Sequence, residues 1–107
     1  MELTVTFDKK ANRFVCMVED RESSVEFEEK NGVMDIYRTF VHPDVRGRGI
    51  AEKLMAAAID HARTNNFLVY PSCSYAVTFL RRHPEYNDVL DKKADLENNG
   101  SCRLGVI

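Results

Sequence analysis

The segment Arg46–Ala51 has the residue types of an anion-binding loop. It follows an apolar run that predicts a strand and opens a stretch that predicts a helix. Backbone N–H groups at a helix start have no intrahelical acceptor and carry the positive end of the helix dipole. Gly47 and Gly49 let an anion approach these groups, and Arg46 and Arg48 can meet phosphate bidentately. The segment therefore predicts a pyrophosphate site, with a tight strand-to-helix turn carrying solvated arginines as the alternative.

A second group of reactive side chains, Cys73, Ser74 and Tyr75, follows a short apolar run. Ser72 is predicted to cap a helix that begins at Cys73. Because a helix N-terminus lowers the pKa of a thiol, Cys73 is a candidate nucleophile. The alternative is a small buried residue at a strand end. Tyr75 and Ser74 are further catalytic candidates, and Tyr75 equally fits an aromatic side chain that packs inward.

The histidines and one strand carboxylate complete the candidates. His42 adjoins the loop and could act as a base, or could simply end the strand before it. His61 falls late in the predicted helix and His83 precedes a proline. Neither has a metal partner four residues on, so no metal site is predicted. Asp35 is either a carboxylate in the cleft or the partner of a neighbouring lysine.

The elements that must position these residues follow from hydrophobic periodicity. Alternating apolar residues predict strands around Leu3–Phe7, Phe14–Val18 and Val25–Phe27. Asn31-Gly32 suits a type I′ hairpin turn, because both residues tolerate positive φ. The nearly continuous apolar run Val33–Val41 predicts a central strand with both faces covered.

The second half of the chain predicts two helices and one strand. A helix from about Gly49 to Asn65 has an apolar stripe formed by Ile50, Leu54, Met55, Ala58, Ile59 and Ala62. A short strand over Phe67–Tyr70 and a helix over Cys73–Arg82 follow, and Glu85–Leu90 predicts one more short turn. This order predicts a mixed α/β (α+β) fold, with a parallel strand–helix–strand unit at its centre.

Length, charge and cysteine usage restrict the class of protein. A chain of 107 residues is one domain on length. A net charge of -2 argues against general nucleic-acid binding. Cys16, Cys73 and Cys102 are odd in number and lack C-x-x-C spacing, which favours a reducing compartment. No apolar stretch approaches the roughly 20 residues of a membrane span, and the start has no basic segment, so we expect a cytoplasmic protein without a membrane partner.

The stretch Val41–Ala51, followed by Leu54, resembles the coenzyme A-binding motif of the GNAT N-acetyltransferase superfamily. That motif reads Arg or Gln, two residues, Gly, one residue, Gly or Ala, and Arg46, Gly49 and Ala51 fill it. Further landmarks are similar, in the same order, to a minimal subfamily of the YjdJ type over roughly residues 14 to 90. They are the turn Asn31-Gly32, the loop, Pro71-Ser72-Cys73-Ser74-Tyr75 and Arg82-His83-Pro84-Glu85-Tyr86.

The resemblance implies a minimal acetyltransferase domain over residues 1–90, and the polar composition after Asp91 predicts a flexible tail over residues 91–107. It implies a mainly antiparallel sheet, splayed between its parallel fourth and fifth strands, with acetyl-coenzyme A in the cleft. The pantetheine arm is expected along the end of the fourth strand, at Thr39, Phe40 and Val41. The pyrophosphate is expected on the amides of Arg48, Gly49, Ile50 and Ala51. The implied bulge in the fourth strand is permitted by the sequence, because Arg38 shares its parity with the apolar Ile36 and Phe40.

The activity that the resemblance implies is acetyl transfer to an amine, directly or through Cys73, where the subfamily also has a cysteine. Many family members protonate the departing thiolate with a tyrosine on the helix after the fifth strand, which points to Tyr75. The subfamily often has histidine where this chain has Arg38, and it lacks the helices that bind the acceptor, so the acceptor stays open. We expect a monomer or weak dimer. The alternatives are a non-catalytic acyl-coenzyme A sensor and a basic-loop RNA binder, against which the acidic balance speaks.

Overall fold

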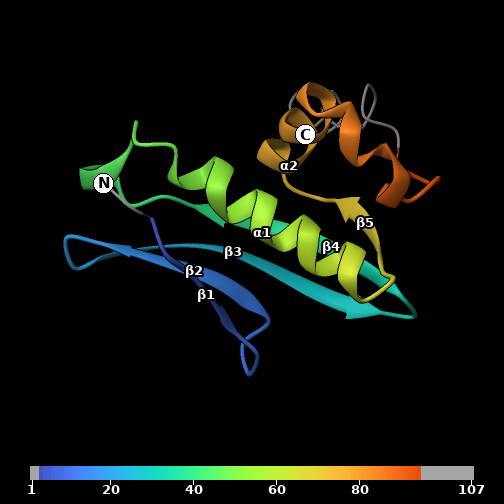
Figure 1. The fold of residues 1–107 in the computed structure, drawn as a ribbon, viewed down its shortest axis with the longest axis horizontal. Helices are drawn as coiled ribbons and strands as arrows, with labels where there is room; N and C mark the ends of the chain where they lie inside the picture. The colour runs from blue at the N-terminus through green and yellow to red at the C-terminus, as the bar shows by residue number, and fades with distance from the viewer. Residues whose placement is uncertain (1–2, 95–107) are drawn as a thin grey trace.

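A computed structural model describes residues 3–94 of the chain, in which a long helix lies across a five-stranded sheet (Figure 1). The predicted mixed α/β fold is confirmed. Cys102 and the part of the predicted tail from residue 95 on lie outside the described residues. In chain order the elements are β1 Val5–Asp8, β2 Arg13–Val18, β3 Arg21–Lys30, β4 Val33–Phe40, the 3-10 turn η1 Pro43–Val45, α1 Ile50–Thr64, β5 Leu68–Pro71, α2 Ser74–Arg82 and the 3-10 turn η2 Pro84–Val89.

The sheet has the order β1-β2-β3-β4-β5, with antiparallel pairs up to β4 and a parallel pair between β4 and β5. The predicted turn Asn31-Gly32 joins β3 to β4 with φ values of 54° and 81°. Both angles are positive, as a type I′ turn requires. A second two-residue turn, Glu19-Asp20, joins β2 to β3.

The core lies between α1 and one face of the sheet. All six residues of the predicted apolar stripe are buried, including Leu54 and Met55, which are fully buried. The sheet contributes Phe14, Cys16, Val18, Val25, Phe27, Met34 and Ile36. Burying each large side chain of this kind stabilises the fold by about 1.5–3 kcal/mol. Within residues 3–94, no helix is long and apolar enough to cross a membrane.

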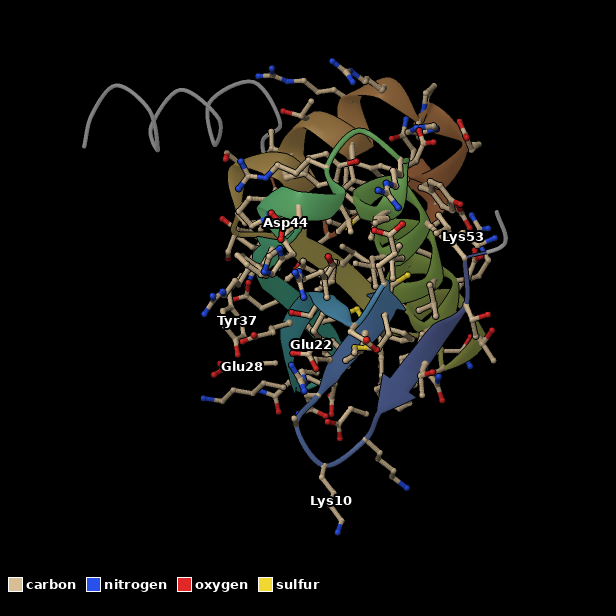
Figure 2. All side chains as sticks on the ribbon, turned by 90° about the vertical axis from the view of Figure 1, so that its left-hand side faces the viewer. Lys10, Glu22, Glu28, Tyr37, Asp44 and Lys53 are labelled. Atoms are coloured by element: carbon tan, nitrogen blue, oxygen red, sulfur yellow. The ribbon has the colours of Figure 1, made fainter. Side chains whose placement is uncertain are left out.

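The prediction that both faces of β4 are covered is wrong. Tyr37 is 44% exposed and Arg38 is also exposed. Figure 2 shows Tyr37 and Glu28 on the side of the sheet opposite Lys53, a residue of α1. The strand–helix–strand connection places α1 on one face of β4 only. The buried residues of β4, Met34 and Ile36, therefore lie on that face, and the other face stays open.

A bulge and an early end to pairing separate β4 from β5. Glu26 of β3 lies opposite Arg38 and Phe27 lies opposite Ile36, so Tyr37 is the extra residue of a bulge on β4. Pairing with β5 ends at Ile36 and Pro71. Beyond that pair, β4 continues along β3 while the chain after β5 turns into α2. The bulge and the splay of the two parallel strands are thus confirmed.

Candidate functional site

The glycines of the loop are required by its backbone conformation. Gly47 and Gly49 have φ values of 84° and 77°, a region that other residues rarely adopt. A Cβ atom built at either glycine meets no atom within 4 Å. Glycine is therefore needed here for its positive φ, and the space beside both residues is open.

The first turn of α1 has unsatisfied amides. Gly49 precedes the helix and offers no side-chain cap, and the first helical hydrogen bond runs from the Lys53 N–H to the Gly49 carbonyl, at 3.1 Å. The amides of the residues before Lys53, in the first turn of α1, have no intrahelical acceptor. The positive end of the helix dipole lies at this turn. A hollow of about 440 Å³ opens at this point, lined by Val41, Arg46, Gly47, Gly49, Ile50, Ala51, Glu52 and Tyr75. The site can accept an anion.

The two arginines of the loop are placed differently. Arg46 lines the hollow, and its Nε donates to the Val41 carbonyl at 3.2 Å. Arg48 does not line it. Its Nη1 and Nη2 instead donate to both carboxylate oxygens of Glu19, at 2.9 and 3.4 Å. These hydrogen bonds raise the pKa of Arg48 and lower the pKa of Glu19. The sequence predicted that both side chains face the phosphate, but Arg46 alone faces the hollow in this structure.

Cys73, and not Ser72 as predicted, caps the second helix. Its Sγ accepts a hydrogen bond from the Ala76 N–H at 3.4 Å, and α2 begins at Ser74. Ser72 still belongs to the sheet edge, because its N–H donates to the Ile36 carbonyl at 2.9 Å. The Cys73 N–H donates to the same carbonyl at 3.1 Å, so the helix can begin only after both bonds to β4. The cap directs the Ala76 N–H at the sulfur of Cys73.

A contact across the splay joins Cys73 to β4. The hydroxyl of Thr39 lies 3.4 Å from the sulfur of Cys73. Thr39 follows the bulge, on the part of β4 that extends beyond its pairing with β5. The structure therefore brings together two predicted site residues that are 34 positions apart. Phe40 and Val41 continue the strand from there toward the hollow.

Tyr75 lies in the first turn of α2 and lines the hollow beside the loop. Burial raises the pKa of Tyr75, and the carboxylate of Glu52 adds to the rise. The hydroxyl therefore stays protonated at neutral pH and can donate a proton or a hydrogen bond. Ser74 is exposed, and it is absent from the lining of the hollow.

His42 has a structural contact at the end of β4. Its Nδ1 accepts a hydrogen bond from the Asp44 N–H at 3.1 Å and so caps η1. The backbone N–H of His42 donates to the Ser23 hydroxyl at 3.1 Å. Nδ1 is thus engaged, and the proton of the neutral ring lies on Nε2. This geometry matches the alternative in which His42 ends the strand.

Sequence reasoning missed an acidic and a histidine side chain beside the loop. Glu52, on the exposed side of α1, lines the hollow, and its carboxylate lies 3.5 Å from His83 Nε2. His83 Nδ1 lies 3.0 Å from Glu85. A smaller hollow of about 300 Å³ lies next to these side chains and shares Gly49 and Glu52 with the first. Nothing in the local sequence pairs α1 with residues beyond α2, so no pattern could have revealed this group.

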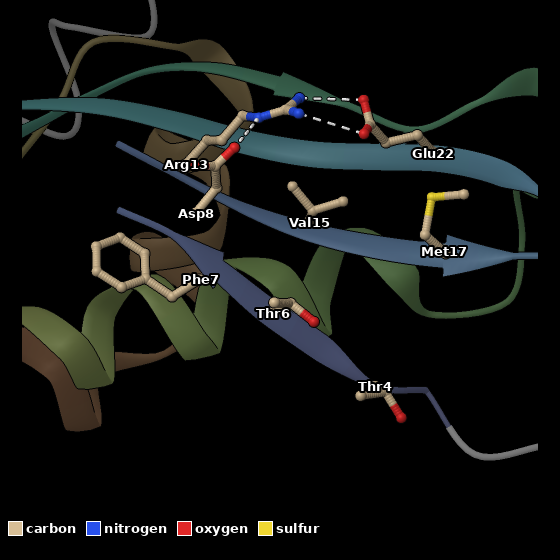
Figure 3. A pocket seen from close by; sticks show the side chains of 8 residues that line it. All are labelled: Thr4, Thr6, Phe7, Asp8, Arg13, Val15, Met17 and Glu22. Carbon is tan, nitrogen blue, oxygen red and sulfur yellow. Dashed lines mark hydrogen bonds and ion pairs between the residues drawn. The ribbon is translucent and has the colours of Figure 1, made fainter. Parts of the chain in front are cut away.

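Two remaining features lie outside the hollow beside the loop. A hollow of about 600 Å³ lies over β1, β2 and β3 (Figure 3). Arg13 forms ion pairs there with Asp8, at 3.4 Å, and with Glu22, at 3.0 Å. Its charged groups are already paired with one another. Elsewhere, Asp35 Oδ1 is buried without a hydrogen-bond partner among the described residues. Over residues 3–94, no three His, Cys, Asp or Glu side chains are grouped as a metal site.

Comparison with known proteins connects this geometry to a family. Residues 13–89 match the sequence model of the GCN5-related N-acetyl-transferases. The fold is similar to the NMR structure of a GCN5-like candidate N-acetyltransferase from Staphylococcus aureus, with 27% identity over 83% of this chain and 88% of that chain and a TM-score of 0.68. A crystal structure of a Trypanosoma brucei acetyltransferase, at 18% identity, shares the fold over 69% of this chain and 62% of that chain, with a TM-score of 0.50.

Proposed function

The chain belongs to the GCN5-related N-acetyltransferase family, and on that premise we propose that it transfers acetyl from acetyl-coenzyme A to an amine. The observation that carries this proposal is the uncapped first turn of α1, which opens into a hollow of about 440 Å³ between the loop and α2. Anionic phosphate groups suit such a turn, because its N–H groups and helix dipole favour negative charge.

The donor fits along the loop and the end of β4. The pyrophosphate is held by the amides from Arg48 to Ala51 and by the guanidinium of Arg46, which already lines the hollow. The pantetheine arm follows Thr39, Phe40 and Val41, where β4 extends beyond its pairing with β5 and can bond a ligand in place of a strand. The thioester then lies toward Thr39 and Cys73.

Proton transfer to the leaving group is assigned to Tyr75. When the amine attacks the thioester carbonyl, the C–S bond breaks and coenzyme A leaves as a thiolate, which needs a proton. Tyr75 is protonated at neutral pH because burial raises its pKa. Its position in the first turn of α2 lies beside the hollow and two residues after Cys73.

The proposal includes a second route, in which acetyl passes through a transient thioester on Cys73 in place of direct attack by the amine on acetyl-coenzyme A. The Cys73 sulfur, which accepts the Ala76 N–H, attacks the acetyl carbonyl and releases coenzyme A thiol, with the proton of Cys73 replacing the one that Tyr75 donates. The acceptor amine then attacks acetyl-Cys73 and restores the free thiol. Ser74 and His42 enter no step, since one is exposed and the other caps η1.

One sample tests donor binding and the route through Cys73. Titration of the labelled protein with acetyl-coenzyme A is expected to shift the amide resonances of Arg48–Ala51, and the intact mass of the same sample is expected to rise by one acetyl group. Failure of the loop resonances to move would refute donor binding. Loop shifts without an adduct, with amines still acetylated, would leave direct transfer in place of the Cys73 step.

A non-catalytic acyl-coenzyme A sensor is the second candidate. The engagement of His42 Nδ1 with Asp44 favours it, because this removes the histidine beside the loop from the candidate bases. The sensor would be established if the protein binds coenzyme A but acetylates no amine in a broad panel, and if Cys73→Ala and Tyr75→Phe leave the affinity for coenzyme A unchanged. Turnover that either substitution lowers would exclude it.

A further inference from the structure

One ion pair ties the loop to a distant hairpin turn, and a second ties η1 to the strand that follows this turn. Glu19 in the turn between β2 and β3 holds Arg48 through two hydrogen bonds of 2.9 and 3.4 Å. Two residues on, Arg21 holds Asp44 of η1 at 2.9 Å. The turn and the first residue of β3 thus hold the segment between β4 and α1 at two points, and the first of these pairs involves a residue of the loop.

The residue types of this turn are not explained by its backbone. Glu19 and Asp20 have φ values of 52° and 64°, and the equivalent turn Asn31-Gly32 has 54° and 81°. Asn and Gly are favoured at these positions, whereas Glu rarely adopts positive φ. A glutamate therefore stands at a position whose backbone conformation disfavours it. The contact that its side chain makes is the one with Arg48, and the pKa of Glu19 is lowered by that contact first.

We propose that Glu19 is a positioning residue that competes with the ligand's phosphates for Arg48. In this structure the carboxylate holds the guanidinium away from the hollow, so that Arg46 faces the ligand from the outset and Arg48 joins only after leaving Glu19. This inference rests on the proposed binding of coenzyme A. It adds that Glu19, which does not line the hollow, weakens that binding.

The exposure of the pair makes such an exchange accessible. The side chains of Arg48 and Glu19 are 34% and 59% exposed. Exposed ion pairs are weak because water and salt screen them, whereas a guanidinium binds phosphate through charge-assisted bidentate bonds. A pyrophosphate at the start of α1 can therefore take Arg48 from the carboxylate of Glu19. Breaking the ion pair costs free energy, which lowers the apparent affinity of the protein for coenzyme A.

Calorimetric titration of coenzyme A into the wild type, Glu19→Gln and Asp44→Asn tests the proposal. Glu19→Gln frees Arg48 and is expected to tighten binding about two- to fivefold, which is the range of a weak exposed ion pair. Asp44→Asn is the matched control, since it removes one carboxylate of the neighbouring pair and leaves Arg48 with Glu19. It is expected to stay close to the wild type.

Two further measurements separate positioning from a structural role. Pantetheine, which has no phosphate, should bind the wild type and Glu19→Gln equally. In an Arg48→Gln background, Glu19→Gln should give no gain. For acetyl transfer, Glu19→Gln should lower the KM for acetyl-coenzyme A and leave kcat unchanged.

The outcomes distinguish this inference from the proposed function. Equal or weaker coenzyme A binding by Glu19→Gln would overturn the inference while wild-type binding still supports the function. The same gain in Asp44→Asn, or with pantetheine, would also overturn it, because the effect would then reflect general charge or fold. If neither the wild type nor any variant binds coenzyme A, the proposed function fails and the inference fails with it.

Discussion

Two helices of this protein begin after its two parallel strands, and their first turns are built differently. Before α1, Gly49 adopts a left-handed conformation and offers no cap to the amides that follow. Before α2, Cys73 is extended and its sulfur accepts the Ala76 N–H. Both turns present the positive end of a helix dipole to the same region between β4 and β5.

The difference shows that the cap decides what a helix start can do. An uncapped turn leaves its amides for a ligand, so α1 is suited to bind an anion. A turn capped by a side chain directs an N–H at that side chain, so in α2 the Ala76 N–H is taken by the sulfur of Cys73. The contact between Thr39 and Cys73 joins the start of α2 to β4.

The largest expected effect is at the second helix start. Tyr75→Phe removes the proposed acid and should lower kcat by about a hundredfold or more, with little change in KM for acetyl-coenzyme A. Since the pKa of Tyr75 is raised, the wild-type rate should show no loss from tyrosine ionisation below about pH 10. Steady-state kinetics across pH measures both. A kcat in the variant equal to that of the wild type would remove Tyr75 from the mechanism.

The next effect concerns the open start of α1. Gly49→Val forces a β-branched residue into positive φ, which should cost about 1–2 kcal/mol of unfolding free energy. It should also weaken coenzyme A binding about tenfold or more, because the first-turn amides lose their alignment. Denaturant melts and calorimetry measure the two effects.

Gly49→Asn is the control for this substitution, since Asn tolerates the left-handed region. It should keep most of the stability and most of the affinity. If Gly49→Val bound coenzyme A as tightly as Gly49→Asn, the conformation of the cap would not matter for the ligand.

Charge at the open start gives a smaller effect. Arg46→Gln removes the guanidinium that lines the hollow and should weaken coenzyme A binding about tenfold. Arg48→Gln should weaken it less, because Arg48 first has to leave Glu19. Calorimetry at one fixed salt concentration compares them. The reverse order would contradict the assignment of Arg46 as the arginine that faces the ligand from the outset.

The smallest effect tests the cap of α2. Cys73→Ala removes the acceptor for the Ala76 N–H and should destabilise the fold by about 0.5–1 kcal/mol, since sulfur is a weak acceptor. Cys73→Ser supplies a better cap and should be as stable as the wild type, yet carry no acetyl thioester. Thermal melts and intact mass separate the two roles. A loss of stability in Cys73→Ser equal to that in Cys73→Ala would show that the sulfur packs rather than caps.

Local patterns predicted the elements well where a residue's role depends on near neighbours. The stripe of α1, the Asn31-Gly32 turn and the glycine loop follow from periodicity and from allowed φ values. The start of α2 was predicted one residue early, because serine is a preferred cap in sequence and cysteine is not. The N–H groups of both Ser72 and Cys73 donate to the carbonyl of Ile36 in β4, far away in the chain, so the helix begins only at Ser74.

The subfamily of the YjdJ type, the cytoplasmic location, the domain boundary at residue 90 and the oligomeric state stay predictions. The sequence by itself determined the glycine loop, the family resemblance and the order of the helices and strands, because these depend on residue type and short spacing. Only the tertiary structure decided that Arg46 faces the hollow while Glu19 holds Arg48, and that Thr39 meets Cys73. Such pairings depend on how the sheet brings distant segments together, and no local pattern contains that information.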